Sequence, residues 1–287
     1  MAKLTVALAT FNEEKNLGAC LESVKNLADE IVIVDGTSTD KTAEIAKQFG
    51  AKMKIVENQQ IFHINKQKAL EMATNEWILQ LDADEIVSPG LAQEINKIIH
   101  MSDQEIELHQ QNLTKKKLFL RHQGLLEERD GNIGTKEGKY AAFFIPRLNF
   151  FLGKYLRFGG VYPDGVIRLI RKGLAKFPCK DVHEQIIVDG KVGWLENDLI
   201  HMADPTFKRY IARNNRYVNL IAKQLEDAKT GKDPLTASKY LLGMPLWWFF
   251  LTFLRHKGFK DSWQGFVFSF FSALRFPRAY YKYLSHS

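Results

Sequence analysis

Strand-like and helical patterns alternate through the first hundred residues, and no other feature of the sequence constrains the fold as strongly. Four short apolar runs predict strands, at 4–10, 31–35, 53–57 and 77–85. Each run is followed by a segment of helical spacing, at 13–27, 39–49, 65–73 and 89–99. Alternation repeated four times is typical of a parallel sheet with helices on both faces. We therefore expect an α/β fold whose mostly parallel sheet begins in this segment.

The rest of the chain departs from this pattern in three stretches. Residues 102–139 are charged and polar, and they predict a strand or hairpin with an exposed loop. Short β-like stretches return over 140–192 between glycine-rich turns, which indicates a mixed extension of the sheet. Residues 207–229 predict a long amphipathic helix, whose apolar face holds Ile211, Val218, Ile221 and Leu225.

Three polar clusters stand where predicted strands end, at 10–14, 35–40 and 82–85. Parallel α/β sheets bind ligands at the carboxyl ends of their strands. The clusters are distant in sequence, but the predicted sheet brings these strand ends to one edge. The sequence therefore predicts a ligand site at that edge.

Asp82 and Asp84 flank one residue at the end of the fourth predicted strand. Alternation along an ideal strand would point both carboxylates to the same side, where they could hold one cation. Carboxylate oxygens suit Mg²⁺ or Mn²⁺, and such an ion beside a diphosphate would neutralise charge on a leaving group. The alternative is a solvated strand end followed by a helix-capping acid. The two neighbouring polar clusters favour the metal site.

The other two clusters also allow a functional and a structural interpretation. Asp35 could hydrogen-bond a base or ribose, or it could cap the turn that runs to Asp40. The cluster around Thr10 could be a simple helix start. Neither the glycine pattern of dinucleotide-binding folds nor that of phosphate-binding loops occurs in these segments.

Taken together, the clusters carry a family resemblance. The motifs T-F-N-E-E at 10–14, V-D-G-T-S-T-D-K-T at 34–42 and L-D-A-D-E at 81–85 resemble, in order and spacing, those of the inverting family-2 glycosyltransferases. Further motifs resemble those of the subgroup around the lipopolysaccharide core β-1,4-glucosyltransferases. They stand at 147–154, 159–164, 168–173, 182–184 and 258–266. The resemblance covers nearly the whole chain and implies the GT-A fold, a Rossmann-like sheet flanked by helices.

The resemblance also implies a role for individual positions. Donor binding is implied for eight residues: Thr10, Asn12, Glu14, Asp35, Lys66, Asp82, Arg168 and Arg171. The residues of the first two clusters would contact the nucleoside, and the two arginines would contact the diphosphate or the acceptor. The implied metal ligands are Asp84, Asp82 and His201. A lone histidine is usually structural, and the proposed metal is what favours a ligand role for His201.

An inverting transfer needs one base, which takes the proton of the acceptor hydroxyl during attack on the anomeric carbon. The resemblance implies that Glu184 is this base, with His183 beside it. The rival carboxylates are Asp181 and Asp164. The metal and cationic side chains would stabilise the departing nucleoside diphosphate.

Two positions depart from the family pattern. Many relatives carry a second acid where this chain has Gly36, so one nucleoside contact is lost or supplied elsewhere. Lys66 and the glutamine after it replace a frequent polar pair. The two cysteines, Cys20 and Cys179, have no zinc-binding or disulfide-framework spacing and suit a reducing cytosol.

The basic character of the chain is confined to its C-terminal third. Residues 1–205 hold 26 basic against 29 acidic residues, a net charge of −3, whereas 206–287 hold 14 against 4, a net charge of +10. Charge-free runs at 240–254 and 262–274 are shorter than the roughly 20 apolar residues of a spanning helix. With their tryptophans and flanking Lys and Arg, they predict a helix pair lying in an anionic membrane interface.

The alternative for this region is a hydrophobic core or a dimer interface. Nucleic acid is disfavoured as a partner, because the basic residues flank apolar runs and no DNA- or RNA-binding motif occurs. The opening residues, MAKLTVALAT, lack a long apolar region with a cleavage site, so we expect no signal peptide.

The sequence as a whole predicts a metal-dependent, inverting glycosyltransferase that moves a hexose from a UDP-sugar to a lipid-linked or cell-envelope glycan. The expected domains are a catalytic domain over 1–205, divided into a nucleotide-sugar half (1–100) and an acceptor half (101–205), and a basic, aromatic-rich helical extension over 206–287. The expected location is cytoplasmic, on the inner face of the plasma membrane. The alternatives are a polyprenyl-phosphate glycosyltransferase and, outside enzymes, a nucleotide-binding regulator or scaffold.

Overall fold

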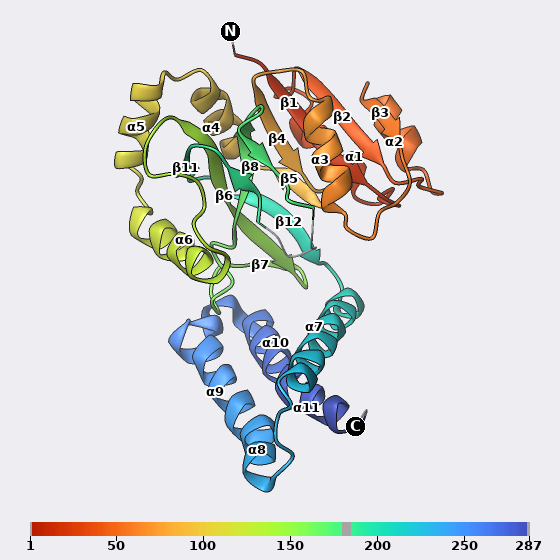
Figure 1. Cartoon of the computed structure of the whole chain (residues 1–287), viewed down its shortest axis with the longest axis vertical. Coiled ribbons are helices and arrows are strands. Elements are labelled where there is room, and N and C mark those ends of the chain that lie inside the picture. The colour runs from red at the N-terminus through yellow and green to blue at the C-terminus, as the bar shows by residue number, and fades with distance from the viewer. Residues whose placement is uncertain (1, 180–184, 286–287) are drawn as a thin grey trace. The chain divides into compact units, whose positions relative to one another are not determined.

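The structure is a computed structural model that describes residues 2–179 and 185–285 of the chain. The chain forms two compact units, whose elements are labelled in Figure 1. Unit 1 comprises Met1–Arg147 and Pro163–His201, and unit 2 comprises Leu148–Tyr162 and Met202–Ser287. Strands β6 (Tyr140–Phe151) and β12 (Leu199–Asp204) pass from unit 1 into unit 2, so each unit holds part of both strands.

Unit 1 begins with a four-stranded parallel sheet in the order β3-β2-β1-β4. The sheet and its connections comprise β1 (Leu4–Thr10), α1 (Leu17–Val24), β2 (Glu30–Asp35), α2 (Thr42–Gln48), β3 (Lys52–Ile55), α3 (His63–Met72) and β4 (Trp77–Leu81). Alternate residues of β1 enter different cores, because Val6 and Leu8 pack with Leu21 of α1, whereas Ala7 packs with Leu70 of α3. Helices therefore cover both faces of the sheet, as the alternation predicts.

Beyond β4 the sheet continues with strands of mixed direction. Strand β8 (Gly165–Arg171) pairs antiparallel with β4 and with β6, and β11 (Lys191–Trp194) runs parallel to β6. Strand β5 (Glu85–Val87) pairs antiparallel with β12, and β9 (Ala175–Lys176) with β10 (Ile187–Val188) forms a separate two-stranded sheet. The predicted α/β fold class and the predicted mixed extension are both confirmed.

Helix α4 (Pro89–Ile99) occupies the span that its spacing predicts. The hydroxyl of Ser88 accepts a hydrogen bond from the backbone N–H of Leu91 at 3.2 Å. Pro89 stands at the first helical position, where a backbone N–H would have no partner within the helix. A side-chain cap and a proline together fix the start of this helix.

Within residues 102–139 the predicted strand or hairpin is wrong, whereas the predicted exposed loop is found at 131–139. In place of a strand or hairpin, the structure has two helices, α5 (Asp103–Gln111) and α6 (Lys116–Asp130). A reciprocal capping box starts α5, and the fully buried Phe119 anchors α6 in the core. Few apolar residues anchor these helices, so their charged composition hides the helical period.

The fourth predicted strand is too long, because β4 ends at Leu81 and Asp82–Asp84 lie outside any strand. Two hydrogen bonds of 3.0 Å close the segment: the N–H of Glu85 donates to the carbonyl oxygen of Asp82, and the N–H of Asp82 donates to Oε2 of Glu85. Strand alternation therefore cannot align the carboxylates of Asp82 and Asp84, contrary to the expectation.

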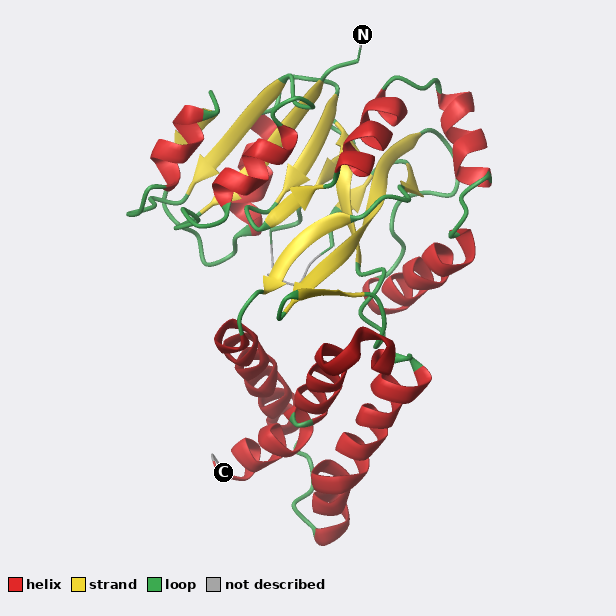
Figure 2. Ribbon diagram, turned by 180° about the vertical axis from the view of Figure 1, so that it is seen from behind, coloured by secondary structure: helices red, strands yellow, loops and turns green. Residues whose placement is uncertain are grey.

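Unit 2 is mostly helical, and Figure 2 shows its helices in red. The predicted amphipathic helix is confirmed as α7 (Phe207–Asp227). The other elements are β7 (Lys154–Leu156), α8 (Pro234–Ser238), α9 (Met244–Phe250), α10 (Ser262–Ala273) and α11 (Arg275–Ser285), with π-helical segments at 239–243 and 251–255 and a 3-10 turn at 258–261. Helices α7 and α11 pack together, with Val218 against Ala279 and Leu225 against Tyr280.

Length and apolar character decide whether a helix can cross a bilayer. Over residues 2–179 and 185–285, no helix combines the length with the apolar character that crossing a membrane needs.

Candidate functional site

The first two polar clusters meet at the carboxyl ends of β1 and β2, where Thr10 and Asp35 are register partners. The hydroxyl of Thr10 donates to Oδ2 of Asp35 at 2.8 Å. Ser38 donates to the same carboxylate through its backbone N–H at 2.8 Å and its hydroxyl at 2.7 Å. Asp35 is only 1% exposed, so its carboxylate joins the two loops. Its contact with a nucleoside stays a prediction.

Asn12 and Glu14 tie the same loops together. Asn12 has a left-handed φ of 55°; its N–H donates to the hydroxyl of Ser38 at 2.8 Å, and its side-chain oxygen accepts from the N–H of Thr39 at 2.9 Å. The backbone N–H of Glu14 donates to Oδ2 of Asp40 at 3.0 Å. The first two clusters therefore converge as the strand-end argument predicts.

The third cluster lies at the same edge, because the register of β1 with β4 sets Leu8 opposite Leu81 and so brings Asp82 close to the level of Thr10. Nζ of Lys66, on α3, lies 2.5 Å from Oδ1 of Asp82. Nη2 of Arg168, on β8, lies 2.6 Å from Oδ2 of Asp82 and 2.7 Å from Oε1 of the fully buried Glu85. Two cations and two carboxylates from different elements thus form one network.

Asp82 and Arg168 keep their charges within this network. Burial by itself would raise the pKa of Asp82, but Arg168 and Lys66 more than offset this and hold that pKa well below its ordinary value. Burial lowers the pKa of Lys66, and Asp82 opposes the shift. Burial would also lower the pKa of Arg168, but Asp82 and Glu85 outweigh it and raise that pKa. Asp82 is therefore ionised at neutral pH.

Arg147, the last residue of β6 within unit 1, extends this network toward Asp164. Nη2 of Arg147 lies 3.0 Å from Oδ2 of Asp164, and Nη1 lies 3.5 Å from Oε1 of Glu85. A cation held against a carboxylate stabilises the ionised form and makes it a weaker base. Asp164, one of the rival bases, is therefore engaged in an ion pair, and its role as a base stays a prediction.

Asp84 has different neighbours from Asp82 and lies beside His201 of β12. Oδ2 of Asp84 and Nε2 of His201 are 3.6 Å apart, and the two side chains are 20% and 16% exposed. Over residues 2–179 and 185–285, no three His, Cys, Asp or Glu side chains form a metal-binding group. One oxygen and one nitrogen donor at this spacing fit a divalent ion that takes its other ligands from water and phosphate oxygens.

Asp82 is less suited than Asp84 to bind such an ion directly. Both of its carboxylate oxygens face cations, Lys66 at one and Arg168 at the other. Direct ligation of a metal would require one of these ion pairs to break. The structure therefore shows Asp82 as an anchor for the two cations, and the metal-binding roles of Asp84, Asp82 and His201 stay predictions.

Arg171 lies outside this cluster, although the sequence assigns it to the same site as Arg168. The two arginines are three residues apart on β8, so they point to opposite faces and stand roughly 10 Å apart along the strand. Arg171 is the register partner of Trp77, at the amino end of β4. Its guanidinium lies 4.7 Å from the Trp77 ring and 2.9 Å from Asp103. The structure therefore gives Arg171 a local role, away from the carboxyl ends of β1, β2 and β4 where the polar clusters meet.

The expected base, Glu184, and its neighbour His183 fall within residues 180–184, outside the described residues. Asp181, the other rival base, lies in the same segment. The roles of these three residues stay predictions.

Three residues of the network were not predicted from the sequence as site residues: Gln80, Glu85 and Arg147. Gln80 is a buried polar residue in an otherwise apolar strand, and such a residue needs a hydrogen-bond partner. Its side-chain oxygen accepts from Arg168, so the polar residue within the strand was a usable signal. Glu85 and Arg147 stood inside motifs of the family resemblance, at 81–85 and 147–154.

Gly36, which replaces an acid of many relatives, lies against Asn58 in the loop after β3. A Cβ atom added at Gly36 would be 3.0 Å from Oδ1 and 3.3 Å from Cα of Asn58. This spacing is too tight for a side chain unless Asn58 shifts. The structure therefore leaves little room for the missing acid.

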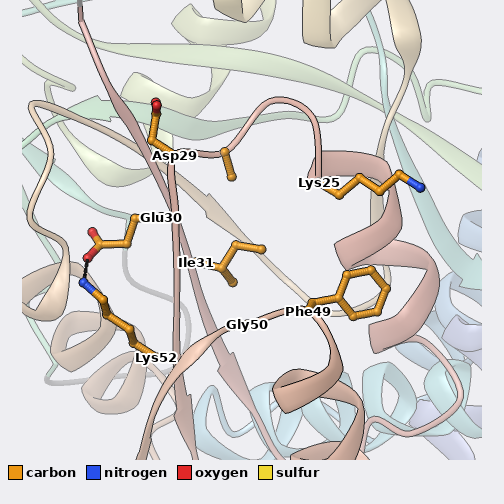
Figure 3. A pocket seen from close by; sticks show the side chains of 8 residues that line it. Lys25, Asp29, Glu30, Ile31, Phe49, Gly50 and Lys52 are labelled. Carbon is orange, nitrogen blue, oxygen red and sulfur yellow. Dashed lines mark hydrogen bonds and ion pairs between the residues drawn. The ribbon is translucent and has the colours of Figure 1, made fainter.

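A small pocket of about 240 Å³ lies at the opposite end of β2, as Figure 3 shows. Glu30 and Lys52 form an ion pair of 2.7 Å at its side, and Phe49 contributes to its wall. Burial would raise the pKa of Glu30, but hydrogen bonds from Lys52 and other donors lower it to about 2. Glu30 begins the strand that Asp35 ends, so this pocket is not part of the converging clusters.

Comparison with known proteins places these residues in context. The model of the family described as glycosyl transferase family 2 matches residues 5–173. An uncharacterized glycosyltransferase of Rickettsia typhi is 30% identical over 289 residues, which cover 97% of this chain and 86% of that protein. The lipopolysaccharide core biosynthesis glycosyltransferase LpsC of Rhizobium meliloti is 26% identical over 95% of this chain and 91% of its own length.

Solved structures show only a weak likeness. Glucosyl-3-phosphoglycerate synthase of Mycobacterium tuberculosis, in complex with Mn²⁺, UDP and glucosyl-3-phosphoglycerate, is 20% identical over 36% of this chain and 41% of its own, with a TM-score of 0.31. A likeness of this size supports no inference about the present chain.

Proposed function

This chain belongs to glycosyl transferase family 2 and is a glycosyltransferase, and from that premise we propose that it transfers a hexose, with inversion, from a UDP-sugar to a lipid-linked or cell-envelope glycan. The family predicted from the motifs is confirmed, and the alternative of a non-enzymatic regulator is set aside. The observation that carries the proposal is the convergence of Thr10, Asp35 and Asp82 at adjacent strand ends, beside the cations Lys66 and Arg168. A nucleoside diphosphate needs both a polar pocket and nearby positive charge.

The acceptor class rests on similarity over the whole chain. LpsC, described as a lipopolysaccharide core biosynthesis enzyme, matches over nine-tenths of both proteins. That extent supports a cell-envelope glycan as the acceptor of the present enzyme.

On the donor side, the loops around Thr10, Asn12, Glu14 and Asp35 would hold the nucleoside. Lys66 and Arg168 would face the diphosphate, because the ion pairs with Asp82 fix both cations at this edge of the sheet. Positive charges fixed before the reaction stabilise the negative charge that develops on a leaving group, at no cost of reorganisation. Asp82 would therefore act by positioning these two cations.

Asp84 and His201 would hold Mg²⁺ or Mn²⁺, to which the spacing and chemistry of their donor atoms are suited. When bound, such an ion neutralises part of the charge of a departing diphosphate. Glu184 would accept the proton of the acceptor hydroxyl during the transfer. The ion pair of Asp164 with Arg147 supports this choice over Asp164.

Replacing Asp84 by asparagine tests the donor and metal assignments together. In the unaltered chain, a UDP-hexose with Mn²⁺ is expected to raise the melting temperature, because a ligand that binds only the folded state stabilises it. In the D84N variant the apparent affinity for Mn²⁺ should fall by about tenfold or more, since even outer-shell changes at metal sites cost 10–100-fold. Thermal-shift titrations of Mn²⁺ at a fixed UDP-hexose concentration, with donor hydrolysis measured in parallel, provide the check.

Glu22→Gln is the control, because Glu22 is an exposed acid on α1. Its Mn²⁺ titration should match that of the unaltered chain. An equally unchanged titration in D84N would remove Asp84 from the metal site. A complete lack of stabilisation and hydrolysis with every UDP-hexose would reject the donor class itself.

The helices of unit 2 carry the surface that we assign to the membrane. Leu246, Trp247 and Phe250 of α9 are each more than half exposed, and Trp263 and Phe266 of α10 are also exposed. Side chains with this exposure do not belong to a hydrophobic core within the described part of the chain. This weighs against the alternative that these helices form a hydrophobic core. Exposed aromatic residues with basic residues near them suit the headgroup region of an anionic bilayer.

The double variant W247A/F250A is expected to bind anionic vesicles at least about tenfold more weakly than the unaltered chain. Burying a side chain of this size contributes about 1.5–3 kcal/mol, and two are lost. Co-sedimentation with vesicles of phosphatidylglycerol and phosphatidylcholine measures the change. The matched control is L108A/L120A, which removes two exposed leucines from unit 1. Equal losses in the two variants, or no binding by the unaltered chain, would contradict the assignment.

A further inference from the structure

A groove of about 780 Å³ lies within unit 2, between α7, the segment before α9, and α11. Its volume is within the range of small-molecule binding sites. One part of its lining is apolar, with Leu241, Leu274 and Pro277. The other part is polar, with Asn215, Arg278 and Lys282. None of these residues belongs to the candidate donor site of unit 1.

The polar part is built by two matched pairs along the contact of α7 with α11. Arg278 donates through Nη2 to the side-chain oxygen of Asn215, and Nζ of Lys282 donates to that of Asn219 at 2.7 Å. In each helix the two residues are four positions apart, so they stand on one face, one turn from each other. Two cations are therefore presented together along one side of the groove.

The partners of Arg278 leave its charge in place. Its guanidinium contacts the amide oxygens of Asn214 (3.4 Å) and Asn215, both of which are neutral, and no carboxylate pairs with it in the described ranges, 2–179 and 185–285. An amide orients a guanidinium without cancelling its charge. The amide nitrogen of Asn215 adds a further hydrogen-bond donor on the same side. This is the chemistry that recognises a phosphate oxygen.

The apolar part of the groove selects among phosphate-bearing ligands. Leu241, Leu274 and Pro277 line it beside Arg278, so a ligand must offer hydrocarbon and an anion within a short distance. A free phosphate would leave this apolar lining in water. Leu241 belongs to the same helical run as the exposed Leu242 and Leu246, the second of which is part of the surface that we assign to the membrane.

We propose that this groove binds one membrane lipid with an anionic phosphate headgroup, the phosphate at Arg278 and Lys282 and part of an acyl chain over Leu241, Leu274 and Pro277. The site goes beyond general attachment to a membrane, and it rests on the proposed function only in assuming that unit 2 meets a bilayer. It would give the enzyme a saturable preference for anionic lipid, in addition to the non-specific attraction between its positive charge and the membrane.

The test uses the full chain and a water-soluble lipid, dihexanoylphosphatidylglycerol, below its micelle concentration. Isothermal titration calorimetry should show saturable binding with one site. Dihexanoylphosphatidylcholine, which is zwitterionic, and inorganic phosphate, which has no chain, should each bind at least roughly tenfold more weakly, since both the charge-assisted hydrogen bonds and the apolar contact contribute. Equal binding of all three probes would overturn the proposal.

Variants then locate the site. R278Q/K282Q removes both charges but keeps polar side chains, and it should weaken binding of the anionic lipid roughly tenfold or more. The matched control, K208Q/K223Q, removes two exposed lysines of α7 that do not line the groove, and it should bind like the unaltered chain. Equal losses in the two double variants would mean that only net charge matters, which would overturn the site.

A third variant covers the case in which R278Q/K282Q fails to fold. Leu241→Asp changes an exposed residue of the groove, so folding should be retained while lipid binding falls by a similar factor.

Sedimentation velocity without lipid tests a second copy of the chain as the occupant. Dimers that R278Q/K282Q disrupts, with no lipid binding, would overturn the proposal. Donor hydrolysis is measured separately, so failure of lipid binding does not count against the transfer reaction.

Discussion

Replacing Glu184 by glutamine is expected to lower kcat by a factor on the order of 10² or more while leaving nucleotide-sugar binding intact. Glutamine has nearly the same shape as glutamate but cannot accept the proton of the acceptor hydroxyl. The donor site that we propose, around Asp82 and Arg168, does not require this carboxylate. Turnover with a saturating acceptor and thermal-shift titration with the donor measure the two properties separately.

The rival carboxylates supply the controls for this experiment. Asp164→Asn breaks the ion pair with Arg147 and is expected to act mainly on folding or KM, because that carboxylate is already held by a cation. Asp181→Asn should keep most of the turnover. Near-normal turnover in Glu184→Gln would contradict the assignment. If one of these two variants then lost a factor of 10² or more, the residue replaced in that variant would be the base.

Replacing Arg168 by methionine is expected to lower the free energy of unfolding by about 3–5 kcal/mol, the cost of leaving a buried carboxylate without its cation. Arg168 is the closest cation to Glu85, which is fully buried, and it also pairs with Asp82. Methionine fills much of the same volume without a charge. Urea denaturation followed by tryptophan fluorescence measures the difference.

Arg171→Met is the matched control, since it makes the same substitution three residues along the same strand. The partners of Arg171, Asp103 and Glu76, are both at least one-third exposed, so water compensates much of the lost pairing. A loss of about 1 kcal/mol or less is expected there. Similar losses in the two variants would show that Arg168 does not compensate a buried charge.

The early part of the fold could be predicted because the runs of β1, β2 and β4 are apolar and buried and a segment of helical spacing follows each of them. Residues 102–139 could not, because one buried aromatic residue, Phe119, and a capping box at Ser102 are the main signals of two helices. The end of β4 was missed for another reason. A side chain, that of Glu85, accepts the N–H of Asp82 and helps to close the turn, and periodicity does not encode such a contact.

The site could be predicted as far as strand ends could be located. Thr10, Asp35 and Asp82 follow from the rule for parallel sheets, but the partner of Arg168 depends on a long-range antiparallel register, with Leu79 opposite Leu169. Local sequence does not specify that register. Alternation alone, however, could have separated Arg168 from Arg171, because residues three apart on a strand face opposite ways.

The close approach of Gly36 to Asn58 has a consequence for how this enzyme could change over time. The first side-chain carbon of an acid at position 36 would lie 3.0–3.3 Å from atoms of Asn58, so Asn58 would have to give way by a few tenths of an ångström. A change that displaces Asn58 would have to precede or accompany it. The two positions are therefore expected to change together.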